Sequence, residues 1–374
     1  MAFDDHRLAE AKAMPIEQVV NLLGIQGLVR AGHELVGPCP GCGGRDRFGV
    51  NLRKGVFLCR RCDAKGGTID LVMLTMGMEF KAALEWLVGP SQEISPEERR
   101  SRERQAEQNR LVNEARAARE RQEAIRMARE IWAEGKPAEG TAVREYLTRR
   151  GIAQDLLPEL PKCLRFAPDL PYTQKAEAGW QVIHRGPAML AAVQGPDGML
   201  TAVHRTWLDL GQPNGKAKIV DPKTGEAQPS KKVIGSKKGG AIRLSRPTYQ
   251  AGVMVMGEGI ETTLSAMVSG VDADAMFWAG VDLGNMAGRR KTRGEGVKFA
   301  GLPDLEDDEA FLPPPCVTRL VYVMDGDSEP RLTRAKLLAG LRRAMLKRPG
   351  LKGQIAAAPQ GLDLNDVLMG KTDG

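Results

Sequence analysis

Cys39-Pro-Gly-Cys42 and Cys59-Arg-Arg-Cys62 are the two stretches that decide the fold of the first part of this chain. Each stretch places two thiols on one tight knuckle, and two such knuckles a short distance apart supply the four ligands of one tetrahedral Zn²⁺. Residues 46–52 and 55–58 read as two short strands between the knuckles, so the pattern predicts a zinc ribbon. Two disulfides or a set of unused thiols are the alternatives. Because four protein ligands leave no open position, the predicted zinc is structural.

The overall composition narrows the class of protein. The chain has 374 residues, of which 42% are hydrophobic and 27% are charged, and this is typical of a globular protein with two or three domains. Aromatic residues make up only 5%, which argues against base stacking on many exposed rings as the main mode of binding. A net charge of +7 is compatible with a polyanionic partner.

The sequence contains no evident targeting signal. Its first residues lack a basic segment followed by an apolar run, so we expect no signal peptide. It has no stretch of 18 uncharged apolar residues, so we expect no membrane partner. Metal-type cysteine pairs fit a reducing compartment, and we therefore expect a cytoplasmic protein.

Helical patterns flank the predicted ribbon and continue beyond it. Apolar spacing predicts helices over 16–23, from Thr68 after a Gly-Gly pair, and over 82–87 before Gly89. Ser95-Pro96-Glu-Glu98 is a capping box that begins a further helix. Residues 91–135 contain ten Arg and ten acidic residues, so this segment is neutral and is predicted to be a solvated helical linker rather than a nucleic-acid-binding tail.

The following segment carries most of the positive charge. We predict a helix over 142–147 and two strands, 189–193 and 200–208, around a turn at Pro196-Asp-Gly198. Residues 201–245 contain nine Lys or Arg against three acidic residues, a local charge of +6, and the part from Lys216 to Gly240 reads as loop-rich. This pattern predicts a surface for polyphosphate or nucleic acid, with a flexible lysine-rich loop as the alternative.

The last part of the chain alternates between strands and helices. Strands are predicted over 253–257, 275–279, 320–324 and 354–358, with helices over 260–268 and 331–347. Alternation of this kind indicates a parallel sheet that is covered on both faces. The predicted fold class is therefore a multi-domain α+β and α/β protein. Its predicted domains are a zinc ribbon (1–90), a charged helical linker (91–135), a basic α+β subdomain (136–248) and an α/β domain (249–374).

Three carboxylates follow strands of the predicted parallel sheet. Glu258 comes directly after the first strand, and Asp325 and Asp327 come directly after the third. Ligands collect at the carboxyl ends of parallel strands, and Mg²⁺ prefers carboxylate oxygens together with water and phosphate. We expect these three side chains to hold a divalent cation for phosphoryl transfer. Asp-Gly-Asp is also a common turn, so the prediction depends on both fragments occurring in one alternating domain.

These motifs resemble the DnaG-type DNA primases, in particular those of phages, plasmids and prophages. Glu258 in Val-Met-Gly-Glu-Gly-Ile-Glu-Thr, followed by Asp325-Gly-Asp327, is similar to the toprim domain that primases, topoisomerases and some nucleases share. The cysteine pairs followed by Lys65-Gly-Gly-Thr-Ile-Asp-Leu-Val are similar to the zinc-binding domain of the same primases. The order of zinc ribbon, linker, basic subdomain and toprim domain covers nearly all of the chain. Many bacterial relatives have His as one zinc ligand, whereas here all four ligands are Cys.

The resemblance implies a nucleotidyltransferase that makes short RNA primers on single-stranded DNA from ribonucleoside triphosphates. Glu258, Asp325 and Asp327 would be its catalytic residues and would hold Mg²⁺ or Mn²⁺. Asp363 and Asp366 are candidates for further metal ligands, with a helix N-cap as the alternative for each. No helicase motifs follow, so the resemblance implies a separate replicative helicase as partner.

Basic residues of the middle segment resemble the nucleotide-binding and DNA-binding part of this primase group. The candidates are Arg205, Lys231, Lys232, Lys237 and Lys238. His204 is predicted to be a strand residue rather than a catalytic base, because phosphoryl transfer depends on positioning and charge more than on a base.

Two other regions and two other functions stay open. The basic run 289–293 fits a nucleic-acid contact or an exposed loop, and the acidic run 304–309 is predicted to be a surface loop. A toprim nuclease would use the same carboxylates to cut DNA. A replication accessory protein without catalytic activity would bind single strands through the ribbon alone.

Overall fold

The computed structural model describes residues 7–89, 96–176, 179–245, 252–270, 272, 274–292, 297–324, 329–358, 361–362 and 364–370. The chain divides into two compact units. The first consists of residues 1–118 together with 173–182, and the second consists of residues 119–172 together with 183–374. This division into two units does not test the four predicted domains, whose boundaries therefore stay predictions.

The first unit contains an antiparallel sheet of five short strands. They follow one another in chain order and are β1 (Val29–Ala31), β2 (Glu34–Cys39), β3 (Gly43–Asn51), β4 (Val56–Cys59) and β5 (Lys65–Gly66). Phe48 of β3 and Phe57 of β4 are buried, with their ring centroids 5.5 Å apart. The two predicted strands are confirmed, and β1, β2 and β5 are additions too short or too irregular for the sequence pattern to reveal.

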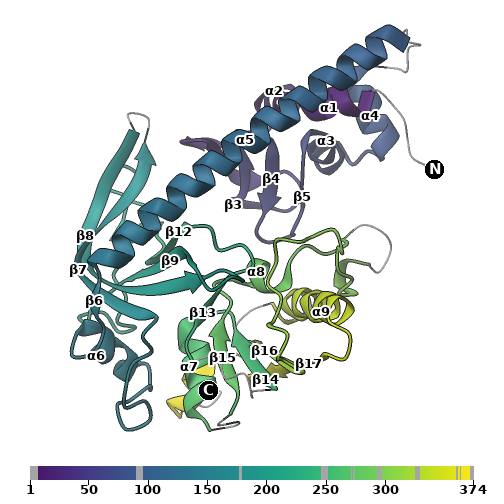
Figure 1. Cartoon of the computed structure of the whole chain (residues 1–374). Coiled ribbons are helices and arrows are strands. Elements are labelled where there is room, and N and C mark those ends of the chain that lie inside the picture. Colours follow the sequence, from purple (N-terminus) through teal and green to yellow (C-terminus); the bar gives the residue numbers. More distant parts are fainter. Residues whose placement is uncertain are drawn as a thin grey trace. The chain divides into compact units, whose positions relative to one another are not determined.

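Four helices complete the core of the first unit (Figure 1). They are α1 (Arg7–Ala13), α2 (Ile16–Leu22), α3 (Thr68–Met76) and α4 (Phe80–Val88). Gly67 precedes α3, and its N–H donates to the Asp70 carboxylate at 2.9 Å, which satisfies one of the free amides at the start of the helix. The three helices predicted here are confirmed, and α1 is an addition.

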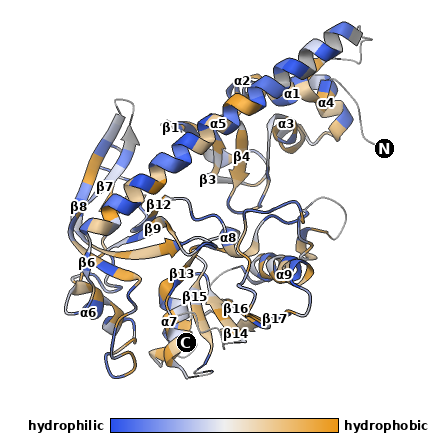
Figure 2. Ribbon diagram, in the orientation of Figure 1, coloured by the Kyte–Doolittle hydropathy of each residue, from blue (hydrophilic) through white to orange (hydrophobic). Residues whose placement is uncertain are grey.

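A single long helix, α5 (Pro96–Glu134), connects residues of both units. It begins at the proline of the predicted capping box, and exposed ion pairs such as Arg110–Glu107 at 2.6 Å stabilise its turns. Figure 2 shows that α5 is mostly hydrophilic, whereas the strands of the second unit are largely hydrophobic. The predicted helix is confirmed. Ala128, near its end, is fully buried in the core of the second unit.

The second unit is built on one continuous mixed sheet. Its main path runs through β12 (Lys231–Gly235), β9 (Leu200–Trp207), β8 (Gly179–Gln194), β13 (Ala241–Arg243), β15 (Met276–Ala279), β14 (Val253–Gly257), β16 (Arg319–Met324) and β17 (Lys352–Ala357). The last four of these strands are parallel, as predicted, and the others are antiparallel to their neighbours. A side branch pairs β7 (Leu164–Ala176) with β8 and with β6 (Lys136–Pro137).

The segment 216–240, predicted to be loop-rich, consists mostly of loops and turns, and it also contains three short strands that the sequence did not reveal. Besides β12, it contains the small hairpin of β10 (Ile219–Val220) and β11 (Ala227–Gln228). The sequence pattern did not predict β12, because its first two residues, Lys231 and Lys232, are both charged, and adjacent charges are typical of a solvated loop. The long aliphatic stems of lysine nevertheless pack well on a sheet.

Helices cover both faces of the parallel strands, as predicted. Helices α8 (Leu283–Ala287) and α9 (Pro330–Lys347) pack on the face that carries Met256 and Trp278. Helices α7 (Ile260–Val268) and α10 (Leu364–Leu368) pack on the face that carries Val255 and Phe277. The helix α6 (Ala142–Arg149) and a 3₁₀ turn (Val297–Phe299) complete the unit. The fold class is therefore multi-domain α+β and α/β.

Among the described residues, no helix combines the length and the apolar character that crossing a bilayer requires.

Candidate active site and metal centre

The four predicted zinc ligands come together in the first unit. The Sγ atoms of Cys39, Cys42, Cys59 and Cys62 all lie within 4.8 Å of one another. The Sγ atoms of Cys39 and Cys62 are 3.9 Å apart, and those of Cys42 and Cys59 are 3.6 Å apart. A tetrahedral zinc with Zn–S bonds of about 2.3 Å places its sulfurs about 3.8 Å apart. The four thiols therefore fit one zinc ion, and they are free rather than bridged.

Backbone amides at the second knuckle favour a thiolate. Burial by itself raises the pKa of Cys59, but backbone donors at Cys62 and Arg61, together with the neighbouring Cys62 and Cys42 thiols, outweigh it and bring the pKa to about 7, whereas burial raises the pKa of Cys39 and of Cys62. A thiolate is the form that binds metal. Since Cys39 and Cys59 are buried while Cys42 and Cys62 are half-buried, the site is closed on one side by the ribbon itself.

In the second unit, Glu258 stands at the carboxyl end of β14. The strand approaches α7 so closely that a Cβ on Gly257 would lie 2.7 Å from the Oγ1 atom of Thr263, and this explains the glycine. Burial raises the pKa of Glu258, and Asp282 nearby raises it further. The N–H of Leu283 donates to the carboxylate and, with the charges of Lys336 and Lys231, acts in the opposite direction.

The connection between β15 and α8 brings Asp282 beside Glu258. Val281 has a φ of +73°, a left-handed conformation that β-branched residues rarely adopt and that costs about 1–3 kcal/mol. Asp282 caps α8 by accepting the N–H of Asn285 at 2.9 Å, and it forms an ion pair with Lys237. A strained backbone that delivers a carboxylate to the edge of the sheet is typical of a functional site.

The remaining predicted carboxylates are placed only in part. Asp325, Asp327 and Asp363 lie outside the described residues. Asp366 is half-buried on α10, a short helix that packs against α7. Its neighbour Asn365 is buried and donates to the backbone oxygen of Arg150.

Three of the predicted basic residues, Arg205, Lys231 and Lys232, lie on strands and divide between the two faces of the sheet. Lys231 and Lys232 are adjacent on β12, so their side chains leave opposite faces. The ammonium group of Lys232 lies 3.9 Å from the ring centroid of Tyr172, and burial lowers its pKa to about 8. Arg205 faces the same side, is 7% exposed and lies 5.2 Å from the ring centroid of Trp207. The structure therefore separates Arg205 and Lys232 from Lys231.

Lys231 belongs to a buried cluster that the sequence did not reveal. Its ammonium group lies 3.0 Å from the carboxylate of Glu261, which is 5% exposed. Lys216 lies 3.5 Å from the same carboxylate, and the hydroxyl of Tyr146 donates to it. Burial alone would raise the pKa of Glu261, but the two lysines and the tyrosine hold it well below its usual range. Glu261 is part of the quoted motif, yet nothing in the sequence signals that it is buried.

His204 lies on the same face of the sheet as Lys231. Burial, reinforced by the positive charge of Lys231, lowers its pKa to about 4, so the imidazole is neutral at pH 7. Its Nδ1 atom, like the Oγ1 atom of its neighbour Thr206, has no hydrogen-bond partner among the described residues. A buried neutral imidazole fits the expected strand residue.

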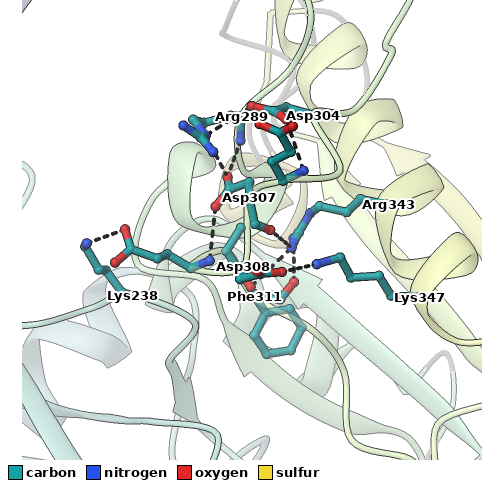
Figure 3. Close-up of polar contacts among 11 residues, drawn as sticks. Lys238, Arg289, Asp304, Asp307, Asp308, Phe311, Arg343 and Lys347 are labelled. Carbon is teal, nitrogen blue, oxygen red and sulfur yellow. Dashed lines mark hydrogen bonds and ion pairs between the residues drawn. The ribbon is translucent and has the colours of Figure 1, made fainter. Parts of the chain in front are cut away.

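Lys238 and the basic run near residue 289 contact the acidic loop 304–309 (Figure 3). Arg289 Nε lies 3.2 Å from Asp304, Lys347 forms an ion pair with Asp308, and Lys238 forms one with Glu309. Arg343, which is 1% exposed, donates to the backbone oxygen of Phe311 at 2.6 Å. The loop is thus held by basic side chains. Residues 293–296 lie outside the described part of the chain.

Comparisons with known proteins give one family and several structures. A family model described as a domain of unknown function (DUF7146) matches residues 122–244. A search of curated proteins gives no match. The chain is similar to the crystal structure of the Aquifex aeolicus primase (zinc-binding and RNA polymerase domains), with 16% identity over 98% of this chain and 83% of that chain and a TM-score of 0.35.

Two further solved structures are similar. One is a DNA primase domain from Pseudomonas aeruginosa, with 12% identity over 66% of this chain and 75% of that chain and a TM-score of 0.39. The other is the primase fragment of the bacteriophage T7 primase-helicase protein, with 13% identity over 91% of this chain and 96% of that chain and a TM-score of 0.31.

Proposed function

We propose that the chain is a DNA primase that joins ribonucleotides into short primers on a single-stranded DNA template. One observation carries the proposal: β14 and β16 are parallel neighbours, and both end at the same edge of the sheet. The register pairs Met256 with Tyr322, so Glu258 is level with Met324, the residue before Asp325. Ammonium groups of Lys231 and Lys336 lie within electrostatic reach of Glu258. Carboxylates and cations at one edge are what metal-dependent phosphoryl transfer requires.

Glu258 fits a divalent cation as a partner. Burial raises its pKa, and the nearby Asp282 adds a second negative charge. A divalent cation beside the two carboxylates would compensate for both effects. In the proposal, Glu258, Asp325 and Asp327 hold Mg²⁺ or Mn²⁺, with Asp363 and Asp366 as candidates for support. The bound ion would stabilise negative charge on the phosphate oxygens during attack by a 3′-hydroxyl.

The other parts of the chain receive roles in the same proposal. The four cysteines hold a structural zinc, and the ribbon that they stabilise contacts the template. Lys231 and Lys237, at the edge near Glu258, bind nucleotide phosphates. Arg205, Lys232 and Lys238 belong to the proposed DNA-binding surface. A replicative helicase is supplied by another protein, and the protein acts in the cytoplasm.

The experiment is incorporation of labelled ribonucleotides on mixed single-stranded DNA templates with Mg²⁺ or Mn²⁺. Asp325→Ala and Asp327→Ala should each reduce incorporation by about 10³-fold or more, because several kcal/mol of charge stabilisation is lost, while DNA binding is retained. Asp308→Ala is the matched control: it removes an exposed aspartate of the same unit and should leave incorporation unchanged.

Other outcomes would overturn the proposal. Undiminished incorporation by Asp325→Ala would refute the metal assignment. Metal-dependent nicking of DNA without incorporation would indicate a nuclease. DNA binding with neither activity, also after addition of a replicative helicase, would indicate an accessory protein.

A further inference from the structure

Glu261 is a buried carboxylate to which the proposed function gives no role. It lies in the first turn of α7, three residues after Glu258, and it is 5% exposed. A buried negative charge is costly unless partners compensate for it. Here the partners are two ammonium groups, of Lys231 at 3.0 Å and of Lys216 at 3.5 Å, and the hydroxyl of Tyr146.

These partners come from three separate parts of the second unit. Tyr146 is on α6, 115 residues before Glu261, and Lys231 is on β12, 30 residues before it. The backbone of Lys216 forms an isolated antiparallel β-bridge with that of Leu208, the residue that follows β9. Three segments that are distant in sequence thus contact one carboxylate. Such convergence fixes where the two ammonium groups stand.

The cluster carries more positive than negative charge. Two ammonium groups share the single carboxylate, since the pKa of Glu261 is well below its usual range, and the Tyr146 hydroxyl donates a hydrogen bond to it. His204, on the same face, adds no charge at pH 7, because its pKa is about 4. Arg150, whose charge also acts on Lys216, adds to the positive potential. This excess of positive charge favours binding of a ligand with several negative charges.

The surplus charge lies beside the proposed metal site. The side chain of Lys231 is 34% exposed and that of Lys216 is 19% exposed, so both are partly open to solvent while their carboxylate is closed off. Lys231 also acts electrostatically on Glu258. A phosphate chain that contacts Lys231 would therefore lie next to the carboxylates that are proposed to hold the metal.

We propose that Lys216 and Lys231 together bind the phosphate chain of the incoming nucleoside triphosphate, and that Glu261, held by Tyr146, is the positioning residue for both ammonium groups. This inference rests on the proposed function, because it names the part of the site that receives the substrate. A positioned pair of ammonium groups discriminates by the number of phosphates, so a triphosphate gains from both lysines and a monophosphate gains less.

A merely structural role for Glu261 makes a different prediction. If the cluster only joins α6, β12 and α7, its loss should weaken every ligand of the site to the same extent. Binding of ATP relative to AMP therefore separates the two roles. The matched control is Glu139→Gln, which also removes a carboxylate from an ion pair in this unit, with Arg144 at 2.7 Å, but leaves the lysines in place.

The test measures binding of ATP and of AMP to the full chain by calorimetry, for the wild type and for Glu261→Gln, Tyr146→Phe, Lys216→Met and Lys216→Arg. Glu261→Gln and Lys216→Met should weaken ATP binding by about 10-fold or more, as expected for loss of a charge-assisted contact, and AMP binding by less than about 3-fold. Tyr146→Phe should weaken ATP binding by about 3-fold, Lys216→Arg should restore most of it, and Glu139→Gln should have no effect. Thermal unfolding checks that each variant folds, and Tyr146→Phe keeps the test valid if Glu261→Gln does not fold.

Each outcome bears on the inference. Equal losses for ATP and AMP, or ATP binding that is unchanged or tighter in Glu261→Gln, would overturn it. A wild type that incorporates nucleotides while Glu261→Gln keeps the same preference for ATP overturns this inference alone. A wild type that binds ATP with a preference dependent on Glu261 but incorporates none supports this inference as nucleotide binding and overturns the proposed function. A wild type that binds no ATP overturns both.

Discussion

The zinc ribbon and the Glu261 cluster are two ways of assembling a site. The four thiols of the ribbon lie within 24 residues of sequence and meet through two short knuckles on neighbouring strands. The groups around Glu261 extend over 115 residues and meet only because a large sheet and two helices bring them together. The first kind of site is encoded in residue spacing, and the second kind is encoded in tertiary structure. The predictions below test this difference.

The ribbon should depend on its metal while the second unit does not. Cys59→Ser, or removal of zinc with a chelator, takes away ligation that contributes about 10–16 kcal/mol of apparent binding energy in small zinc domains. We expect the first unit to unfold and to become sensitive to protease, with residues 183–374 remaining protected. Native mass spectrometry should show the loss of one zinc ion.

Cys163→Ser is the matched control, because Cys163 is a partly buried thiol of the second unit and belongs to no metal cluster among the described residues. Unfolding of both units after loss of zinc would contradict the comparison.

Lowering the pH should reduce the free energy of unfolding, because His204, on the face of the sheet that carries Lys231, is buried in its neutral form. Burial and the nearby Lys231 lower the folded-state pKa of His204 to about 4, against 6.5 for the free side chain. Between these values the unfolded chain binds more protons, so the free energy of unfolding falls as the pH falls from 6.5 to 4. The shift corresponds to about 3 kcal/mol at most. Urea denaturation at several pH values measures it.

His204→Gln removes the titrating group and should flatten this dependence. Carboxylates such as Glu139 also titrate in acid, so the informative quantity is the difference in slope between the wild type and the variant. Equal slopes would show that His204 is not held neutral by the fold.

The smallest effect is expected at the acidic loop. Lys347 forms an ion pair with Asp308, whose side chain is 85% exposed. Exposed pairs contribute about 0–1 kcal/mol, so Lys347→Ala should change the free energy of unfolding by less than about 1 kcal/mol. Thermal or urea unfolding measures the change. A loss of several kcal/mol would show that the loop contributes to stability in the way that the buried pair at Glu261 does.

The sequence predicted the features that depend on local residue patterns, and it did not predict those that depend on tertiary contacts. Apolar runs such as 253–257 and 320–324 gave the parallel strands, because strands buried on both faces require continuous hydrophobic residues. The cysteine spacing predicted the metal cluster for a similarly local reason. The strand Lys231–Gly235 was not predicted, because its first two residues are charged. Each of these lysines contacts a compensating partner on a different face of the sheet, and the sequence does not reveal such partners.

The candidate site was predictable only in its outline. Glu258 stands at the end of its strand, as expected, because chain order and strand direction determine that position. Glu261 was visible in the motif, but its burial depends on Tyr146 and Lys216, whose proximity no spacing encodes. Lys237 and Lys238 were predicted as basic contacts, and their ion pairs with Asp282 and Glu309 are likewise long-range.

The continuous sheet has a geometric consequence for the site. Four strands lie between β12 and β14, so in a flat sheet Lys231 would be separated from the end of β14 by five spacings of about 4.8 Å, or about 24 Å. Yet the Lys231 ammonium lies 3.0 Å from Glu261, just after β14, so the sheet must curl around α7. The pairing of β8 with β9 shifts register between Val193 and Gln194, and irregularities of this kind allow a strand to bend. Curvature of the sheet, and not strand order alone, therefore brings the lysine to the carboxylate, and a change that flattened the sheet would separate them without altering any residue of the site.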